Sequence, residues 1–124
     1  HDLHEADTLL EGVALEIGGE FAQWLGLQRD RRRARVRRSL AELAAMAEAA
    51  KDWDDALTHA GELLALEPLS EEAHRRVIRL HYLAGDRAAA LLAFDRCAQV
   101  LKDEVGAPPS AETMALLATV SQAA

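Results

Sequence analysis

The sequence predicts an all-α protein, built as a short stack of helical hairpins with a long helix before it and a capping helix after it. Two observations lead to this fold class. Half of the 124 residues are apolar, and only 4% are aromatic. Most of the apolar residues are Ala and Leu, which lose little side-chain entropy in a helix, so helix is favoured over sheet. The second observation is that the chain aligns with itself after a shift of 34 residues.

Charge is distributed unevenly along the chain. The formal net charge is −7, yet residues 29–38 hold seven Arg and one Asp, so this segment carries +6 and the remainder −13. An acidic body with one basic segment is not the pattern of a domain that binds nucleic acid over a broad face.

Other features of the sequence indicate the cellular compartment in which the protein is expected. No run of about 18 apolar residues predicts a membrane span, and the N-terminus lacks the basic-then-apolar order of a signal peptide. The chain starts at His1 rather than Met, which indicates an excised domain. A single cysteine, Cys97, cannot form an internal disulfide, so we expect a cytoplasmic protein.

Two regions are expected along the chain: an N-terminal segment, residues 1–19, and the helical domain, residues 20–124. Helical spacing near Leu3 and Leu10 predicts a short helix that stops at Gly12, and Gly18-Gly19 breaks the chain. Residues 20–50 contain no Pro and predict one long helix. Arginines interrupt its apolar stripe. Either their stems lie along apolar surface with the charges in water, or this part of the helix is exposed on all sides.

Three further helices follow, each with its own start and stop signals. Residues 53–66 form a helix that Asp52 caps and Pro68 ends. Residues 70–84 form the next, with Ser70 as cap and Gly85 at its end. We expect these two helices to turn inward the residues Trp53, Ala56, Leu57, Ala60, Leu63, Leu64, Ala73, Val77, Ile78, His81 and Ala84.

The third of these helices begins at Asp86 and is expected to run past Leu101. Its inward set is Ala90, Leu91, Phe94, Cys97, Ala98 and Leu101. The connector of residues 106–109 contains two prolines and is rigid. Ser110 then caps a last helix, with Met114, Leu117 and Val120 predicted on its inner side.

The 34-residue repeat is that of the tetratricopeptide motif. The shift places Lys51-Asp52 on Gly85-Asp86 and Ala56-Leu57 on Ala90-Leu91. The small residues Ala56 and Ala90 occupy equivalent positions, and a small residue there suits two helices that cross closely. Because one such hairpin cannot bury its apolar face alone, the hairpins must stack on each other. The specific expectation is a tetratricopeptide-like, right-handed α-α superhelix with a long N-terminal helix and a C-terminal capping helix.

Several segments, in order, resemble the bacterial transcriptional activator domain (BTAD) of SARP-type regulators. They are residues 63–75 (LLALEPLSEEAHR), 84–91 (AGDRAAAL), 94–97 (FDRC) and 104–113 (EVGAPPSAET), preceded by residues 10–12, 21–25 and 29–31. The resemblance covers roughly residues 9–120. The chain departs from the family pattern at Lys51, where the family favours Gly, at Phe94, where it often has Tyr, and at Val105, where it has Leu.

This resemblance implies a non-catalytic regulatory and protein-interaction domain of a bacterial transcriptional activator. In such regulators the domain follows a winged-helix DNA-binding domain, which this chain does not contain. It acts through self-association, for instance as a homodimer, or through contacts with other proteins. The alternative is a free-standing tetratricopeptide-like adaptor that binds proteins or peptides without a role in transcription. A winged-helix pattern upstream of His1 would favour the first interpretation.

The basic segment is a candidate contact face. Its candidate residues are Arg29, Arg31, Arg32, Arg33 and Arg35. Arginines bind phosphates without reading base sequence, so the partner would be DNA or an acidic protein surface. The alternative is a solvated helix face, since charge runs usually face water.

A second candidate lies on the concave side of the stack. The first helix of each repeat lines that side, and the repeat register assigns Arg38, Glu48, Glu72, Arg75, Arg79 and Tyr82 to a partner groove. Two arginines near a tyrosine suit a peptide or a carboxylate. We expect substitution of Arg75 and Arg79 to leave folding intact and to impair partner binding. The alternative is a solvated groove in a structural spacer.

No residue pattern predicts an enzyme or a cofactor. The histidines lack the cysteine or carboxylate partners of a tetrahedral metal site, and His81 is expected at the edge of the core. Cys97 lies on an apolar stripe, where thiols are usually inert. A glycine-rich phosphate loop and a Ser/His/Asp order are both missing from the sequence.

Overall fold

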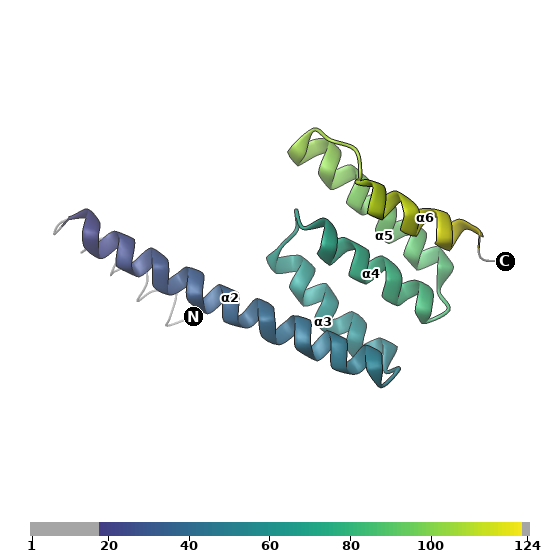
Figure 1. Ribbon diagram of the computed structural model, residues 1–124, viewed down its shortest axis with the longest axis horizontal. Coiled ribbons are helices and arrows are strands. Elements are labelled where there is room, and N and C mark those ends of the chain that lie inside the picture. The colour runs from purple at the N-terminus through teal and green to yellow at the C-terminus, as the bar shows by residue number, and fades with distance from the viewer. Residues whose placement is uncertain (1–17, 123–124) are drawn as a thin grey trace. The chain divides into compact units, whose positions relative to one another are not determined.

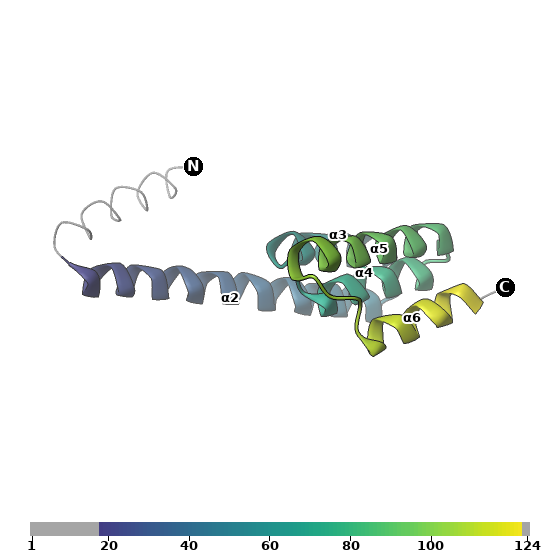
Figure 2. The ribbon, with the colours of Figure 1, turned by 90° about the horizontal axis from the view of Figure 1, so that it is seen from above.

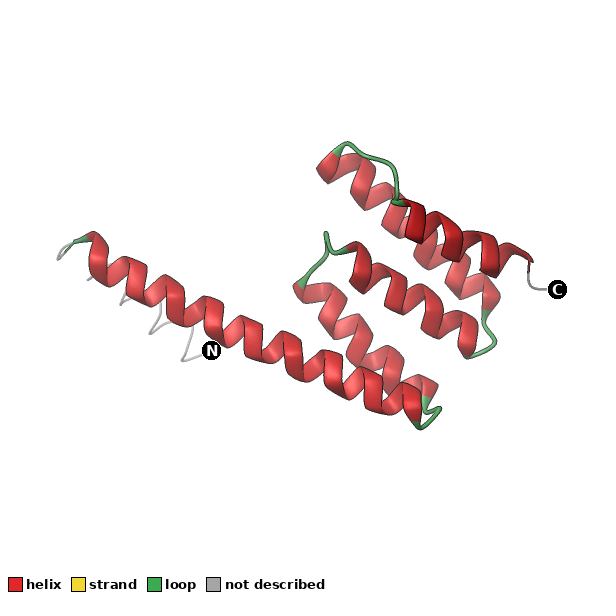
Figure 3. Ribbon diagram, in the orientation of Figure 1, coloured by secondary structure: helices red, strands yellow, loops and turns green. Residues whose placement is uncertain are grey.

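The computed structural model describes residues 18–122, so the short helix predicted between Leu3 and Gly12 lies outside the described residues. The helices are α2 (Gly19–Ala49), α3 (Trp53–Leu66), α4 (Glu71–Leu83), α5 (Arg87–Val100) and α6 (Ala111–Gln122), and a π-helical turn, η1 (Leu101–Val105), follows α5. Residues 18–122 contain no strand (Figure 3). The all-α prediction is therefore confirmed.

The chain divides into two compact units at the boundary between Arg38 and Ser39. The first unit, as far as it is described, is the N-terminal part of α2. The predicted long helix of residues 20–50 agrees with α2 to within one residue at each end. In this part Phe21 and Trp24 stack with ring centroids 5.9 Å apart, and Trp24 is 53% exposed.

The second unit contains the end of α2 and the helices that follow, with successive helices running antiparallel (Figure 1). In Figure 2, α3 and α5 lie on one side and α4 and α6 on the other. Helix α4 packs against α3, α5 and α6. It is therefore the central helix of this unit.

Two small cores lie on either side of α4. The first consists of Ala44, Ala47, Ala56, Ala60 and Leu80, from α2, α3 and α4. The second consists of Ile78, Ala90, Ala93 and Val120, from α4, α5 and α6. Alanine at the crossings allows close approach of the helices, and the larger Leu80 and Ile78 of α4 fill the space on either side of that helix. Neither hairpin buries an apolar face without its neighbour.

The two helix–helix turns confirm the repeat at the level of individual hydrogen bonds. At the end of α2, Lys51 N donates to Glu48 O (2.9 Å) and Asp52 N donates to Ala47 O (2.9 Å). The same pair of bonds recurs 34 residues later, from Gly85 N to Tyr82 O (3.0 Å) and from Asp86 N to His81 O (2.9 Å). Both are Schellman motifs, which end a helix on a left-handed residue.

Each Schellman motif runs directly into an aspartate that caps the next helix. Asp52 Oδ1 accepts from Asp55 N at 3.2 Å, and Asp86 Oδ1 accepts from Ala89 N at 3.0 Å. The left-handed residue is Gly85 (φ 85°) in the second turn but Lys51 (φ 59°) in the first. The departure from the family pattern at Lys51 therefore falls on a position whose backbone favours glycine.

Several details of the predicted packing differ from the structure. Ala84, expected to face inward, is exposed at the C-cap of α4. Helix α5 ends at Val100 and does not run past Leu101 as an α-helix, because the chain passes into η1 at Leu101. Gly106, at φ 73°, ends η1, and its N donates to Leu101 O at 2.8 Å. His81 is half-buried, as expected of a residue at the edge of the core, but the buried histidine is His74, which the sequence did not assign to the core and whose Nε2 donates to Pro68 O at 2.8 Å. Ala93 and Leu80 also belong to the core, although the sequence did not assign them to it.

The inner face of α6 was predicted wrongly in part. Thr113 and Val120 are buried and Leu116 packs against the core, while Met114 is 46% exposed. A buried threonine at this position contradicts the apolar pattern on which the prediction rested. Thr113 is tolerated there because its hydroxyl is hydrogen-bonded to α4, as described below.

Candidate partner-binding face

One face of α4 carries most of the predicted groove residues. Ser70 caps the helix, with Ser70 Oγ accepting from Ala73 N at 3.2 Å. Glu71, Arg75 and Arg79 then recur every four residues, a spacing that places them along one face of a helix. This face is adjacent to the ends of α2 and α6, so its long side chains reach both neighbours.

Arg79 pairs with the helix before it. Its Nη2 donates to Glu48 Oε1 of α2 at 2.7 Å, a charge-assisted hydrogen bond. The Arg79 side chain is 41% exposed and that of Glu48 is 28% exposed. This pair joins two residues that the repeat register assigned to the same groove, and solvent reaches both of them.

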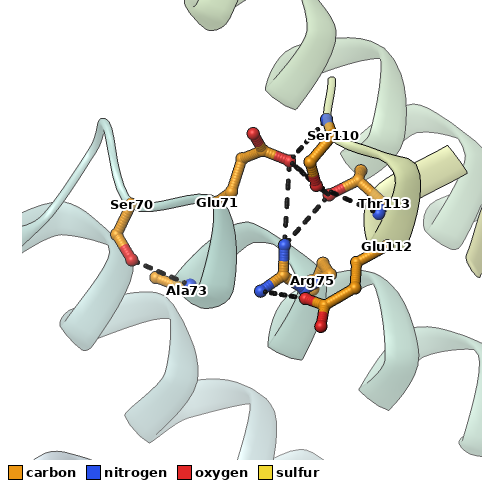
Figure 4. A network of polar contacts seen from close by, with 7 residues as sticks. All are labelled: Ser70, Glu71, Ala73, Arg75, Ser110, Glu112 and Thr113. Atoms are coloured by element: carbon orange, nitrogen blue, oxygen red, sulfur yellow. Dashed lines mark hydrogen bonds and ion pairs between the residues drawn. The ribbon is translucent and has the colours of Figure 1, made fainter.

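Arg75 pairs with the helix after it (Figure 4). Its Nη2 lies 2.9 Å from Glu112 Oε2, and its Nη1 donates to Thr113 Oγ1 at 3.2 Å, both on α6. Glu71 Oε2 lies 3.7 Å from the same Nη1. The side chain is only 23% exposed. Arg75 therefore joins α4 to the capping helix.

Glu71 is the centre of this network (Figure 4). Its Oε2 accepts from Ser110 N (3.0 Å), from Ser110 Oγ (2.8 Å) and from the hydroxyl of Thr113. The hydrogen bond from Thr113 contributes most to a lowered pKa of Glu71, and the bonds from Ser110 and the charge of Arg75 act in the same direction. Partial burial alone would raise this pKa. The carboxylate is thus held ionised by α6.

The other end of α6 is held from α5. Arg87 Nε donates to Val120 O (3.0 Å), and its Nη2 donates to Ser121 O (2.7 Å). An arginine in the first turn of a helix is unfavourable for that helix's own dipole, but a cation is favourable beside the final carbonyls of another helix. The capping helix is consequently fixed at its start by Glu71 and at its end by Arg87.

The remaining groove residues lie apart from these pairs. Glu72 is exposed, and Tyr82 is half-buried against the second core. Arg38 is exposed and belongs to the first unit. Sequence reasoning missed Glu71 and Thr113 as partners of the arginines, because it assigned each helix's polar residues only to that helix's own ends.

The basic segment forms the C-terminal part of the first unit. Arg31, Arg33 and Arg35 are exposed, whereas Arg29 and Arg32 are half-buried. At 100° per residue, Arg31, Arg35 and Arg38 lie on one face, which also carries the exposed Trp24. This face therefore combines three exposed cations with an aromatic ring.

Within residues 18–122, few side chains are suited to catalysis or metal binding. Cys97 is buried, and burial is the main cause of its raised pKa, with the charge of Glu71 acting in the same direction. Residues 18–122 hold no group of three or more His, Cys, Asp or Glu side chains that could bind a metal ion. None of the described helices is long and apolar enough to cross a membrane.

Stacked helical hairpins of this kind define a scaffold that presents side chains on helix faces. The family comparison agrees: the model of the bacterial transcriptional activator domain matches residues 1–121, and the chain belongs to that family. This is a regulatory family, and its match confirms the resemblance seen in the sequence. Neither the curated proteins nor the solved structures give a significant match to the chain.

Proposed function

We propose that this chain is a non-catalytic regulatory and protein-contact domain of a cytoplasmic transcriptional activator. It works with a DNA-binding domain that this chain does not contain. The observation that carries the proposal is the family match over residues 1–121. The helical stack supports it, because such stacks commonly present extended surfaces to partners.

The partner face is the side of α4 that carries Arg79, with Glu48 of α2 beside it, and the repeat register adds Glu72 and Tyr82 to this face. A partner carboxylate exchanges with Glu48 for the guanidinium of Arg79, which is 41% exposed. Arg75 lies deeper, and its charge holds α6. Arg75 therefore shapes this face and Arg79 contacts the partner. Arg38, in the first unit, is assigned to the groove by the repeat register alone.

The test uses the complete regulator in a reporter assay of transcription. We expect Arg79→Ala to reduce activation several-fold while circular dichroism and thermal unfolding stay close to those of the parent. Arg76→Ala, which removes the same charge from another side of α4, is the matched control and should activate normally. Full activation by the Arg79→Ala variant, or an equal loss in both variants, would count against this face.

The basic face contributes a second contact in this proposal. Arg31 and Arg35, which are exposed on the same face of the helix, bind phosphates of the DNA that flanks the site recognised by the DNA-binding domain, and Arg29, Arg32 and Arg33 add positive charge on other sides of this helix. Replacing Arg31 and Arg35 by Ala should flatten the dependence of DNA affinity on salt, by roughly 0.9 in the logarithmic slope for each phosphate that is no longer neutralised. An unchanged slope together with weaker protein binding would assign the face to an acidic partner instead.

Self-association is the remaining part of the proposal. A homodimer would place two copies of the partner face and of the basic face on one assembly, which suits a regulator bound at paired DNA sites. Light scattering of the purified chain over a range of concentrations measures its mass. A mass of one chain at all concentrations would contradict a dimer formed by this domain.

A further inference from the structure

A cavity of about 320 Å³ lies between the C-terminal halves of α3 and α5 and the N-terminal half of α4. Its lining residues are Leu64, His74, Val77, Ala93, Arg96, Gln99 and Val100. The volume falls at the lower end of the range for small-molecule sites, about 300–1,000 Å³. Its walls are almost entirely apolar. None of the residues assigned to the partner face or to the basic face lines it.

The cavity follows from the way the hairpins stack. Helices α3 and α5 both pack along α4, but they scarcely contact each other, so their last turns leave a gap above α4. Val77 and His74 of α4 form the floor, and Ala93 is too small to fill the gap. The 34-residue shift places the larger His59 at the position equivalent to Ala93, so the small residue is particular to the second hairpin.

The polar groups of the lining differ in their availability. His74 Nε2 is used by Pro68 O. The amide nitrogen of Gln99 is used by Asp103, with both carboxylate oxygens at 2.9 Å. Arg96 is exposed, and within residues 18–122 it forms no ion pair. A single available cation therefore stands at the mouth of an apolar cavity.

We propose that this cavity binds a small amphipathic carboxylic acid, with the carboxylate at Arg96 and the apolar body against Leu64, Val77 and Val100. At about 30 Å³ for each water-sized atom, the cavity holds roughly ten or eleven non-hydrogen atoms. Octanoate has this size. Ligand binding here goes beyond the proposed partner contacts and does not depend on them, since the site shares no residue with either face.

The test titrates the chain with octanoate and follows the methyl resonances by NMR. We expect saturable shifts at Leu64, Val77 and Val100 with a submillimolar to low-millimolar dissociation constant. Octan-1-ol and octylamine are the matched probes, and both should bind more weakly than octanoate. Octylamine binding as tightly as octanoate, shifts spread over other residues, or no saturation by about 10 mM would overturn the proposal.

Two variants separate the charge from the cavity. Arg96→Gln should weaken octanoate binding about threefold at low salt, in keeping with a solvent-exposed ion pair, and leave octan-1-ol unchanged. Lys102→Gln is its control, because Lys102 is an exposed cation outside the lining. Equal effects of the two substitutions would refute the role of Arg96.

The cavity itself is tested by filling it. Val100→Phe should abolish octanoate binding, whereas Leu83→Phe, at an exposed leucine outside the lining, should not. Equal binding by these two variants would refute the site. Thermal unfolding shows whether Val100→Phe is folded; if it is not, the comparison of Arg96→Gln with Lys102→Gln decides, because both positions are exposed.

Discussion

Replacing Glu71 by glutamine should loosen the attachment of the capping helix to α4. The carboxylate accepts three hydrogen bonds through one oxygen, from Ser110 N, Ser110 Oγ and the Thr113 hydroxyl. Glutamine keeps an acceptor of similar shape, but it removes the negative charge that these donors and Arg75 share. The change therefore measures the charge of the network with little change in volume.

The magnitude follows from the geometry. A hydrogen bond to a charged group contributes about 1.5–3 kcal/mol when buried, and the Glu71 side chain is 23% exposed. Because glutamine retains part of the bonding, we expect a loss of about 2 kcal/mol in the free energy of unfolding. For a chain of this size the midpoint of thermal unfolding should fall by roughly 8 °C. Glu72→Gln is the matched control, since Glu72 lies in the same first turn but is exposed.

The dependence on pH gives a second, independent readout. Glu71 has a pKa below its ordinary value of 4.5, chiefly because of the Thr113 hydrogen bond. A carboxyl whose pKa is lowered by folding stabilises the protein fully above its unfolded pKa, and this stability is lost as the pH falls through the folded pKa. The difference between the parent and Glu71→Gln should thus be constant near neutral pH and shrink below about pH 4.5.

Calorimetry or urea unfolding at pH 7 and at pH 3.5 measures both effects. If Glu71→Gln and Glu72→Gln cost the same, the hydrogen bonds from α6 do not stabilise the fold. If the cost of Glu71→Gln is the same at both pH values, the carboxylate is not held ionised by its partners. Either result would refute the reasoning.

Three further predictions test the turns, the Arg79–Glu48 pair and the Cys97 thiol. Because Lys51 has φ 59°, Lys51→Gly should raise the free energy of unfolding by about 0.5–1 kcal/mol, and Gly85→Lys at the equivalent turn should lower it by about 1 kcal/mol. Urea unfolding measures both, and a loss of stability in Lys51→Gly would contradict the prediction. A double-mutant cycle of Arg79→Ala and Glu48→Ala should give a coupling energy under about 1 kcal/mol, since the pair is partly exposed, and a coupling well above that would show a stronger pair. Cys97 should react with Ellman's reagent at least about a hundredfold more slowly in the native chain than in urea, because burial raises the pKa of its thiol; equal rates would show that the core opens readily.

The helices and their turns could be predicted from the sequence because their signals are local. Neighbouring residues alone predict Asp52 and Ser70 as caps and Asp86 as the start of its helix, and each accepts a backbone hydrogen bond as a cap does. The 34-residue shift then related one turn to the other. A Schellman motif requires only a few consecutive residues, so the two turns form alike although one has lysine and the other glycine.

The placement of α6 could not be predicted in the same way. Its inner face was assigned from apolar spacing, which selects Met114 and rejects Thr113. The buried threonine is stable only because Glu71, 42 residues away, supplies an acceptor. Apolar periodicity carries no information about such a pairing, and the position of Glu71 in the first turn of α4 is by itself enough to favour a carboxylate there. Helix-by-helix rules therefore predict elements well and contacts between elements poorly.

The same limit applies to the candidate groove. The repeat register placed Arg75 and Arg79 on one face as two equivalent cations, yet their surroundings differ. Arg75 is 23% exposed and bound to three groups, whereas Arg79 is 41% exposed and bound to one. A partner carboxylate that displaced Glu112 from Arg75 would still leave the guanidinium bound to Thr113 and close to Glu71. Displacing Glu48 from Arg79 leaves the Arg79 guanidinium group available for a bidentate contact with the partner carboxylate. If this face binds a partner, Arg79 is consequently the arginine whose loss should weaken binding, and the loss of Arg75 should appear first as a loss of stability.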